Sequence, residues 1–371
     1  MRLCFLCESH SIHSQRWIDF FVKQGHESHV ITPSPPTPTV IQGTHVYHLK
    51  RKLGIIGIHK YIDYLFQIIQ VRSYIRGIKP DLLNVLFLTD YGFYGALSRF
   101  HPYVVTPWGS DILRHPYQKK FWLISNKFSL KSSDLIFCNS KPMHEVLVGK
   151  LEVSEEKIKD ITWNGVDRTI FNPHNCDYLR DKHKLKNKVI LFSNRNLEPI
   201  YNIDCILRMF ADLNGILRES VLLVAGDGSQ REVLLKLCVK LQLNKSVIFL
   251  GRLSPYLMSD YLNIVDIYIT VPQSDSCSGS LLEAFACEKI VIASDIPANK
   301  VWIENSRDGW LVNPENKEEF TSVCLHAIKQ PLKDKEIKNN LRVIKKQADY
   351  YTNMLRVEKE FSRLVDSIPV H

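Results

Sequence analysis

The sequence predicts an α/β protein with two doubly wound parallel sheets in tandem. Short apolar runs alternate with longer amphipathic segments from end to end, a pattern typical of strand–helix–strand units. The pattern restarts after a charged, apolar-poor stretch at residues 174–188. The 371 residues also exceed what one ordinary core holds. We therefore expect two domains of similar size, joined by a linker at 174–188.

The first series predicts a domain over residues 1–175. Its expected buried strands are residues 2–7, 28–32, 81–88, 103–108 and 134–140. Helical patterns cover residues 13–25 and 58–77. In the second of these, apolar residues recur close to a 3.6-residue period, at Ile58, Ile62, Leu65, Ile69 and Ile75.

The second series predicts a domain over residues 188–345. Its expected strands are residues 189–194, 220–226, 246–251, 266–272 and 289–295. A last helical pattern at 348–368 either caps this domain or folds back onto the first. Ligands of such sheets bind at the carboxyl ends of strands, and we expect the two domains to face a cleft.

Bulk composition favours a globular cytoplasmic protein, with 45% hydrophobic and 23% charged residues. The nine cysteines suggest small buried side chains in a reducing compartment rather than a disulfide framework. The apolar run after Arg2 is too short for a signal-peptide core, and no run approaches the roughly 20 residues of a membrane span.

The net charge of +9 is concentrated in one stretch. Residues 50–131 contain 13 Lys or Arg and four Asp, which gives this stretch a net charge of +9. Such a patch fits a solvated face, an anionic membrane surface or a nucleic acid. No nucleic-acid motif with interleaved aromatic residues accompanies it, so nucleic acid ranks last.

Residues 274–295, SDSCSGSLLEAFACEKIVIASD, admit two interpretations. Ser280 and Glu283 have the spacing of a capping box, which explains both residues without a ligand. The small residues from Ser274 to Gly279 instead suit the approach of a diphosphate to a helix N-terminus. Asp275 and Glu283 would then face neutral, hydroxyl-bearing parts of that ligand.

This segment resembles the E-x7-E region of retaining glycosyltransferases of family 4, whose fold is GT-B. The resemblance extends through most of the chain in the same order. Its motifs are RLCFLCES and SIHSQRW near the start, GHE (25–27), WGSDIL (108–113), NS (139–140), NGVD (164–167), AGDG (225–228) and FLGR (249–252).

The resemblance implies a donor site for a UDP- or GDP-linked sugar in the second domain. Glu283 would bind the ribose hydroxyls, and Asp275, one methylene shorter than the usual glutamate, would bind the sugar. Amides around Ser278, Gly279, Ser280 and Leu281 would hold the diphosphate, and Gly251 and Arg252 would flank the base. Arg195 matches the arginine that neutralises the donor phosphates. Tyr201 lies where a lysine is usual and is a candidate hydroxyl donor.

The resemblance also implies that the helix at about 348–368 packs back on the first domain, where the acceptor side is expected. Trp108 replaces a common histidine, so it can stack or donate a hydrogen bond but cannot act as an acid or base. Asp111 is then the best carboxylate for an acceptor hydroxyl, although Gly-Ser-Asp is also a common helix start. His13 and Arg16 either line the acceptor side or have no binding role. In the second case His13 only opens a helix and Arg16 lies in solvent.

The sequence therefore predicts a retaining, hexosyltransferase-type enzyme with Arg195, Asp111 and Asp275 as catalytic residues. The acceptor would be a saccharide or lipid-linked hydroxyl used in envelope polysaccharide or glycolipid synthesis, reached from an anionic membrane surface. No cofactor and no metal are expected. The alternatives are a GT-B nucleotide-sugar epimerase, a degenerate nucleotide-sugar-binding subunit and a nucleic-acid-binding protein.

Overall fold

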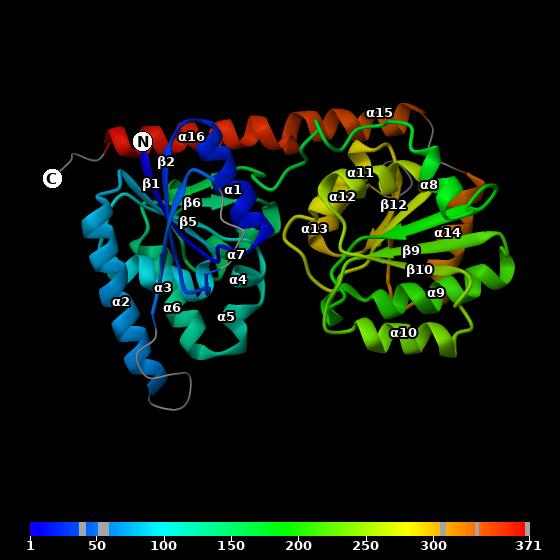
Figure 1. The fold of residues 1–371 in the computed structure, drawn as a ribbon, viewed down its shortest axis with the longest axis horizontal. Helices are drawn as coiled ribbons and strands as arrows, with labels where there is room; N and C mark the ends of the chain where they lie inside the picture. The colour runs from blue at the N-terminus through cyan, green and yellow to red at the C-terminus, as the bar shows by residue number, and fades with distance from the viewer. Residues whose placement is uncertain (37–41, 51–58, 305–308, 331–333, 368–371) are drawn as a thin grey trace. The chain divides into compact units, whose positions relative to one another are not determined.

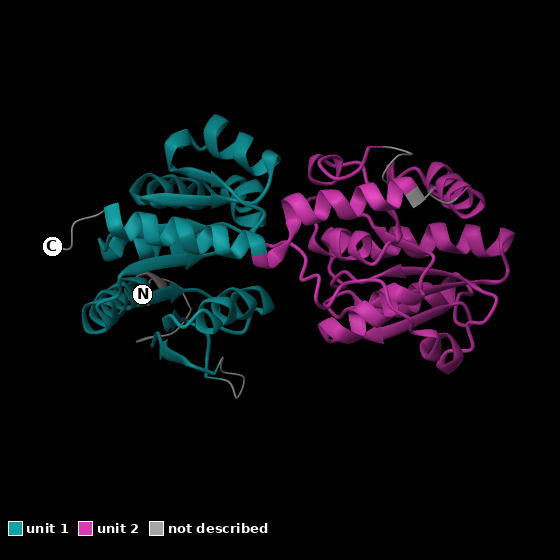
Figure 2. Cartoon of the chain, turned by 90° about the horizontal axis from the view of Figure 1, so that it is seen from above, with its two compact units in different colours: residues 1–163, 352–371 teal, residues 164–351 magenta. Residues whose placement is uncertain are grey.

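The chain folds into two compact units. The computed structural model describes residues 1–36, 42–50, 59–304, 309–330 and 334–367. Unit 1 comprises residues 1–163 and 352–371, and unit 2 comprises residues 164–351 (Figure 2). The linker predicted at 174–188 is wrong: it contains α8 (Asp177–Lys182), and Leu179 and Leu185 are each 1% exposed in the core of unit 2.

Unit 1 is built on a seven-stranded parallel sheet in the order β3-β2-β1-β4-β5-β6-β7 (Figure 1). Its strands are β1 (Arg2–Leu6), β2 (Glu27–Thr32), β3 (Thr44–His48), β4 (Leu82–Leu86), β5 (Tyr103–Thr106), β6 (Leu135–Cys138) and β7 (Ile158–Asp160). The sequence predicted five of them. It missed the edge strands β3 and β7 because β3 is only partly buried and β7 is three residues long, so neither has an apolar run.

Helices cover both faces of this sheet. They are α1 (Ile12–Lys23), α2 (His59–Ile78), α3 (Leu88–Ser98), α4 (Ser110–Leu113), α5 (His115–Gln118), α6 (Lys120–Ser132), α7 (Lys141–Gly149), the 3₁₀ turn Glu155–Lys157 and the C-terminal α16 (Tyr350–Ser367). Helices α2, α3, α6 and α7 share one core with the sheet. On α16, Phe361 stacks on Phe21 of α1 with ring centroids 5.2 Å apart.

The helix predicted at 58–77 forms as α2, but the apolar face assigned to it is wrong. Leu65 and Ile69 are each 63% exposed, and Ile62 is 40% exposed. The buried face carries Ile68 and Val71 together with the predicted Ile75, and it includes two polar residues, Asp63 and Gln67. Ile58, also assigned to that face, lies outside the described residues.

Unit 2 has a six-stranded parallel sheet in the order β10-β9-β8-β11-β12-β13. Its strands are β8 (Val189–Ser193), β9 (Ser220–Ala225), β10 (Val247–Gly251), β11 (Ile267–Thr270), β12 (Ile290–Ser294) and β13 (Trp310–Val312). Besides α8, its helices are α9 (Ile203–Ile216), α10 (Arg231–Lys240), α11 (Pro255–Ile264), α12 (Gly279–Ala286), α13 (Pro297–Lys300), α14 (Lys317–Lys329), α15 (Asp334–Val343), the 3₁₀ turn Pro199–Tyr201 and the π-helical turn Ile344–Ala348. The sequence predicted all of these strands except the three-residue β13.

Both sheets have a topological switch point. In unit 1 the chain runs from β1 to β2 and β3, then continues with β4 on the other side of β1. In unit 2 it runs from β8 to β9 and β10, then continues with β11 on the other side of β8. Ligands of open α/β sheets bind where the strand order reverses, at the carboxyl ends of the strands. The loops after β1 and β4, and those after β8 and β11, are therefore the expected ligand-binding positions.

Two further sequence expectations can be compared with the fold. All nine cysteines are free thiols and eight are buried, as predicted. Within the described part of the chain, no helix combines the length and apolar character needed to cross a bilayer.

Candidate functional site

Arg195 is the centre of a polar cluster at the switch point of unit 2. It follows β8, and its Nη1 donates to the hydroxyl oxygens of Ser278 and Ser280, at 3.0 Å each. Its Nη2 donates to Oδ2 of Asp275 at 2.9 Å, and the guanidinium carbon lies 4.3 Å from the ring centroid of Tyr201. The predicted residues from two loops and one helix start therefore meet around one cation.

Glycine at position 226 lets two loops approach closely and position Arg195. A Cβ atom at Gly226 would lie 2.5 Å from the carbonyl oxygen of Arg195, closer than real Cβ atoms come to backbone oxygen. The next turn holds the same loop, because Leu197 N–H donates to the carbonyl of Asp227 at 3.1 Å. The glycines of the AGDG motif thus serve packing behind the arginine.

Helix α12 begins without a side-chain cap. Its N-cap residue is Ser278, which makes no capping hydrogen bond to the helix through its side chain, and no acidic residue lies in the first turn. The capping box predicted for Ser280 and Glu283 is wrong, because Ser280 is already inside the helix and its hydroxyl accepts from Arg195. The helix N-terminus, with its partial positive charge, is left for another anionic partner.

The other predicted donor residues lie on α12 and at the end of β10. Glu283 is half-buried on α12, one turn after Gly279. Leu281 is buried and its amide donates to the carbonyl of Ser278 at 3.1 Å, so that amide is already used within the helix. Gly251 ends β10 with a φ of +69°, and Arg252 after it is exposed.

The electrostatics keep Arg195 charged. Burial opposes its charge, but the Asp275 carboxylate and the Tyr201 side chain outweigh this and raise the pKa of the guanidinium. Arg195 and Asp275 expose only 12% and 16% of their side chains, so solvent screens their ion pair weakly. Burial also raises the pKa of Tyr268 on β11 to about 12, which keeps this neighbour of Arg195 neutral.

In unit 1, Asp111 is placed as a structural acceptor. It is 0% exposed, and its carboxylate accepts the backbone N–H groups of Leu88 at 2.6 Å, Trp108 at 3.0 Å and Gly109 at 2.8 Å. Burial raises its pKa, although these amides act in the opposite direction. Asp111 therefore ties the loop after β5 to the start of α3 and presents no free oxygen to an acceptor in this arrangement.

The loops at the switch point of unit 1 carry a row of aromatic rings. Trp108 lies edge-on to His13, with centroids 5.4 Å apart, and to Phe87, at 5.9 Å. Phe87 in turn packs edge-on to His115 at 5.6 Å. Of the predicted acceptor-side residues, His13 and Trp108 thus meet, while Arg16 lies one turn further along α1 and is half-buried.

Sequence reasoning missed Phe87 and His115 in this row. Phe87 has a φ of +76°, an unusual backbone conformation for a bulky residue, and sits directly after β4. The strand predicted at 81–88 includes Phe87, whereas β4 ends at Leu86. The contact of Phe87 with Trp108 depends on the neighbouring strands β4 and β5, which the sequence does not order.

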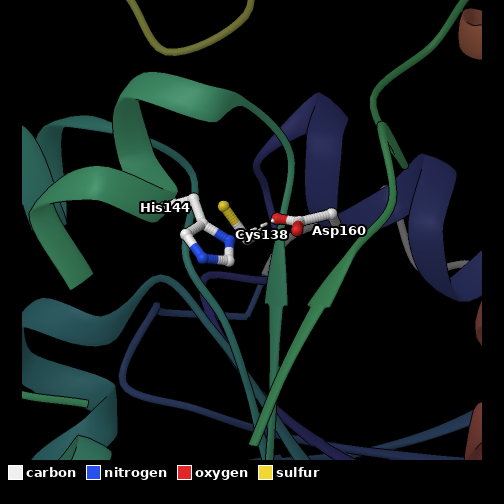
Figure 3. A group of neighbouring side chains, drawn as sticks. All are labelled: Cys138, His144 and Asp160. Carbon is white, nitrogen blue, oxygen red and sulfur yellow. Dashed lines mark hydrogen bonds and ion pairs between the residues drawn. The ribbon is translucent and has the colours of Figure 1, made fainter. Parts of the chain in front are cut away.

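Two groups among the described residues place possible metal ligands within 4.8 Å of one another. Figure 3 shows Cys138 and Asp160, the last residues of β6 and β7, close to His144 of α7. Here Nδ1 of His144 lies 2.9 Å from Oδ1 of Asp160, and the Cys138 thiol donates to the carbonyl of Ser140.

The second group comprises His174, Cys176 and Asp260, in which Nε2 of His174 lies 2.9 Å from Oδ1 of Asp260. Burial raises the pKa of both thiols, and that of Cys176 reaches about 11. Metal ligation needs a thiolate, and a raised pKa disfavours the thiolate form of both cysteines. We assign neither group a role in the chemistry at Arg195.

Comparison with known families matches both parts of the chain. Residues 2–140 match the family described as glycosyl transferase 4-like, and residues 177–344 match glycosyl transferases group 1. The second match contains the whole Arg195 cluster.

Curated relatives are distant and longer than the matched region. An uncharacterised glycosyltransferase of Methanocaldococcus jannaschii is 28% identical over 62% of this chain and 55% of its own length. The N-acetyl-alpha-D-glucosaminyl L-malate synthase of Bacillus anthracis is 24% identical over 64% of this chain and 60% of its own. The D-inositol 3-phosphate glycosyltransferase of Rhodococcus jostii is 26% identical over 54% and 46%. The chain thus spans about half the length of the curated relatives it matches.

Solved structures share the whole fold at low identity. Sucrose-phosphate synthase from Thermosynechococcus elongatus superposes with a TM-score of 0.84 at 16% identity, covering 99% of this chain and 100% of that one. The Anabaena protein HepE, solved in complex with UDP-glucose, superposes with a TM-score of 0.81 at 16% identity, covering 98% and 100%. These similarities establish the architecture.

Proposed function

The chain belongs to the group 1 glycosyltransferases, with a glycosyl transferase 4-like first part and the GT-B fold, and from this premise we propose that it is a retaining, hexosyltransferase-type enzyme. It transfers a sugar from a UDP- or GDP-linked donor to a hydroxyl of a saccharide or lipid-linked acceptor. A peripheral position on the cytoplasmic face of a membrane, in envelope polysaccharide or glycolipid synthesis, fits the basic first unit.

The observation that carries this proposal is the position of Arg195 beside the uncapped start of α12. A departing nucleoside diphosphate gains negative charge as the glycosidic bond breaks. A fixed guanidinium and helix-terminal amides stabilise that charge without having to reorganise. Removing one such donor from an active site typically costs roughly 10²–10³-fold in rate.

The proposed reaction needs no carboxylate base in the protein. The bond between the anomeric carbon and the diphosphate oxygen breaks, and the acceptor oxygen bonds to the same carbon on the same face. The proton of the acceptor hydroxyl passes to the leaving diphosphate. This proton transfer to the diphosphate is consistent with the burial of Asp111, whose carboxylate oxygens already accept hydrogen bonds from backbone amides.

Asp275 and Glu283 have different proposed roles. The Asp275 oxygens contact Arg195 and the Ser276 amide, so we assign Asp275 the task of orienting the cation. Glu283, half-buried one turn into α12, is the proposed acceptor for the ribose hydroxyls. Tyr201 occupies the position where the family pattern has a lysine, and its ring stacks on the Arg195 guanidinium. We therefore propose that this site uses one cation, supported by an aromatic ring, in place of two cations.

The row formed by His13, Trp108 and Phe87 is the proposed acceptor platform. Aromatic faces and edges pack well against the C–H surfaces of a pyranose ring. Asp111 supports this platform by fixing the amide of Trp108 at 3.0 Å.

A donor screen tests the proposal directly. We expect one UDP- or GDP-sugar to raise the melting temperature of the full chain, because a ligand at 100 times its dissociation constant adds about 2.7 kcal/mol. Incubation with the donor alone separates a transferase from an epimerase, which would convert the sugar without an acceptor. Donor binding without turnover on any acceptor would favour the degenerate binding subunit, and no shift with any nucleotide sugar would contradict the donor site.

A further inference from the structure

Helix α6 in unit 1 carries large apolar residues on its exposed side, and its buried residues are Ser125, Asn126, Ser129 and Leu130. It exposes large apolar side chains, with Phe121 at 55%, Ile124 at 69% and Phe128 at 42%. It buries the polar residues Ser129 and Asn126, at 0% and 1% exposed. The three exposed side chains recur at i, i+3 and i+7, so they form one stripe, which we call the α6 stripe.

The neighbouring helix α3 explains why the small polar face is buried. Figure 1 shows α6 beside α3, and a Cβ atom at Gly92 of α3 would lie 3.2 Å from Cβ of Ser129. The helices approach this closely only through small residues. The buried polar atoms are satisfied locally, because Ser129 donates to the carbonyl of Ser125 and Asn126 donates to that of Asp111, both at 2.8 Å. Phe121, Ile124 and Phe128 of α6 are consequently left on the outside.

Helix α2 also exposes large apolar side chains and buries two polar ones, although the rest of its buried face is apolar. On the other flank of α3, helix α2 buries Asp63 and Gln67 and exposes Leu65 and Ile69. The Gln67 side chain is held by the Tyr94 hydroxyl at 2.7 Å. Single exposed apolar residues are ordinary, but several that form one stripe mark an interaction surface.

The charges around the α6 stripe are basic. Residues 113–133, which contain α5 and α6, include Arg114, Lys119, Lys120, Lys127 and Lys131 and no acidic residue. Lys127 is paired with Glu152 at 2.6 Å, and Lys119 lies over the ring of Trp122. The exposed ammonium groups at the start and end of α6 therefore flank the apolar stripe with positive charge.

We propose that α6 is a membrane-docking surface for an anionic bilayer. Phe121, Ile124 and Phe128 enter the boundary between headgroups and acyl chains, and Lys119, Lys120 and Lys131 contact lipid phosphates. Basic helices with an apolar face lie in the plane of the interface in this way. The proposal rests on α6 itself and holds whether or not the sugar transfer proposed above is correct.

Charge and shape favour an anionic lipid surface over a nucleic acid or a second copy of this chain. The lysines could bind the phosphates of a nucleic acid, but a phosphate backbone offers no apolar surface to the α6 stripe. A second copy of this chain would bring an equally basic face against this one, and like charges repel. An anionic leaflet complements both the charge and the apolar stripe.

Co-sedimentation of the full chain with vesicles tests this surface. One set contains phosphatidylcholine alone, and the other contains equal parts of phosphatidylcholine and phosphatidylglycerol. Substituting Lys119, Lys120 and Lys131 by Gln is expected to lower partitioning into anionic vesicles about 100-fold, since each lysine near such a surface contributes about 1 kcal/mol. The variant F121S/I124N/F128S is expected to lower it more than tenfold. The double variant I216N/V239S in unit 2 is the control, because Ile216 and Val239 are 65% and 62% exposed.

Insertion has its own readout, since Trp122 is the one tryptophan of α6. Brominated lipid should quench part of the fluorescence of the wild type and less of that of the Trp122→Phe variant. Equal binding by the α6 variants and the control, equal binding to neutral vesicles, or concentration-dependent dimerisation lost in F121S/I124N/F128S would each overturn the proposal. Binding to an oligonucleotide that needs the lysines, without vesicle binding, would do the same. Donor-induced melting shifts should persist in all α6 variants, so failure of the donor site would be seen separately.

Discussion

The guanidinium of Arg195 donates to the carboxylate of Asp275 across 2.9 Å, and the two side chains are 12% and 16% exposed. Asp275 stands where the family pattern has a sugar-binding glutamate, and its shorter side chain here contacts the cation instead. The residue that matches a ligand-binding position is therefore also the residue that fixes the direction of the proposed phosphate-binding group.

Removing the cation should impair turnover. We expect Arg195→Ala to lower kcat/KM with the best donor about 10²–10³-fold, because the leaving diphosphate loses a preorganised donor. Arg195→Lys should lose less, since it keeps the charge but not the fork of donors. Arg208→Ala, an exposed arginine on α9, is the control and should match the wild type. Steady-state kinetics, with circular dichroism to verify folding, measure this; activity of Arg195→Ala within threefold of wild type would refute the role.

Replacing Asp275 distinguishes orientation of the cation from contact with the sugar. If Asp275 orients Arg195, Asp275→Ala should weaken binding of the free nucleoside diphosphate and of the nucleotide sugar by the same factor, about tenfold, which is the scale of one charge-assisted hydrogen bond. Calorimetric titration of both ligands measures the two factors. A loss confined to the nucleotide sugar would assign Asp275 to the sugar hydroxyls and contradict the orienting role.

Much of this site could be predicted from the order of motifs, and the exceptions have physical reasons. Arg195 and Ser278 were predicted by motif resemblance, which needs no knowledge of contacts. The capping box at Ser280 failed because a local pattern cannot show that an arginine 85 residues earlier occupies the hydroxyl.

The fold shows the same limit. The helical period predicted for α2 is confirmed, but the buried face predicted for it is wrong. The reason is that Gln67 is buried through a hydrogen bond from Tyr94, which lies on another helix. Likewise, Gly-Ser-Asp does not reveal that the carboxylate of Asp111 faces backbone amides.

Glu283 should act on the ribose alone. Glu283→Gln is expected to weaken donor binding about tenfold, because a hydroxyl bonded to a charged acceptor contributes roughly 1.5–3 kcal/mol. The same variant should bind a 2′,3′-dideoxy donor no more weakly than the wild type does. Comparing the two proteins with the two ligands isolates the pairwise energy. Equal losses with both ligands would show that Glu283 acts elsewhere.

Two histidines in unit 2 should give opposite pH dependence of stability. The hydrogen bond with Asp260 raises the pKa of His174, so its stabilising effect is present below the unfolded value near 6.5 and fades as the pH rises through the folded value. Burial lowers the pKa of His183, so protonation in acid costs stability there. The stability lost in His174→Gln should shrink between pH 5.5 and 8.5, and that lost in His183→Gln should grow. His174 is 35% exposed, which keeps its effect below about 1 kcal/mol.

We expect replacement of Asp111 to lower the stability of unit 1. Its carboxylate satisfies the amides of Leu88, Trp108 and Gly109, and each buried amide left unpaired costs about 1–3 kcal/mol. We expect Asp111→Ala to destabilise unit 1 by about 3 kcal/mol and to lower its melting temperature by about 6–12 °C. Asp19→Ala, a half-exposed aspartate on α1, is the matched control and should shift it by less than about 2 °C.

The kinetics of the Asp111 variants decide between a structural and a basic role. Well below the melting transition, folded Asp111→Asn should keep kcat within about tenfold of wild type, because the leaving diphosphate and not this carboxylate takes the proton. A fall of about 10³-fold or more in a variant that is still folded is the signature of a lost general base. That result would mean that the Asp111 carboxylate breaks its hydrogen bonds to the three amides during turnover. Asp111 would then be the base that deprotonates the acceptor hydroxyl.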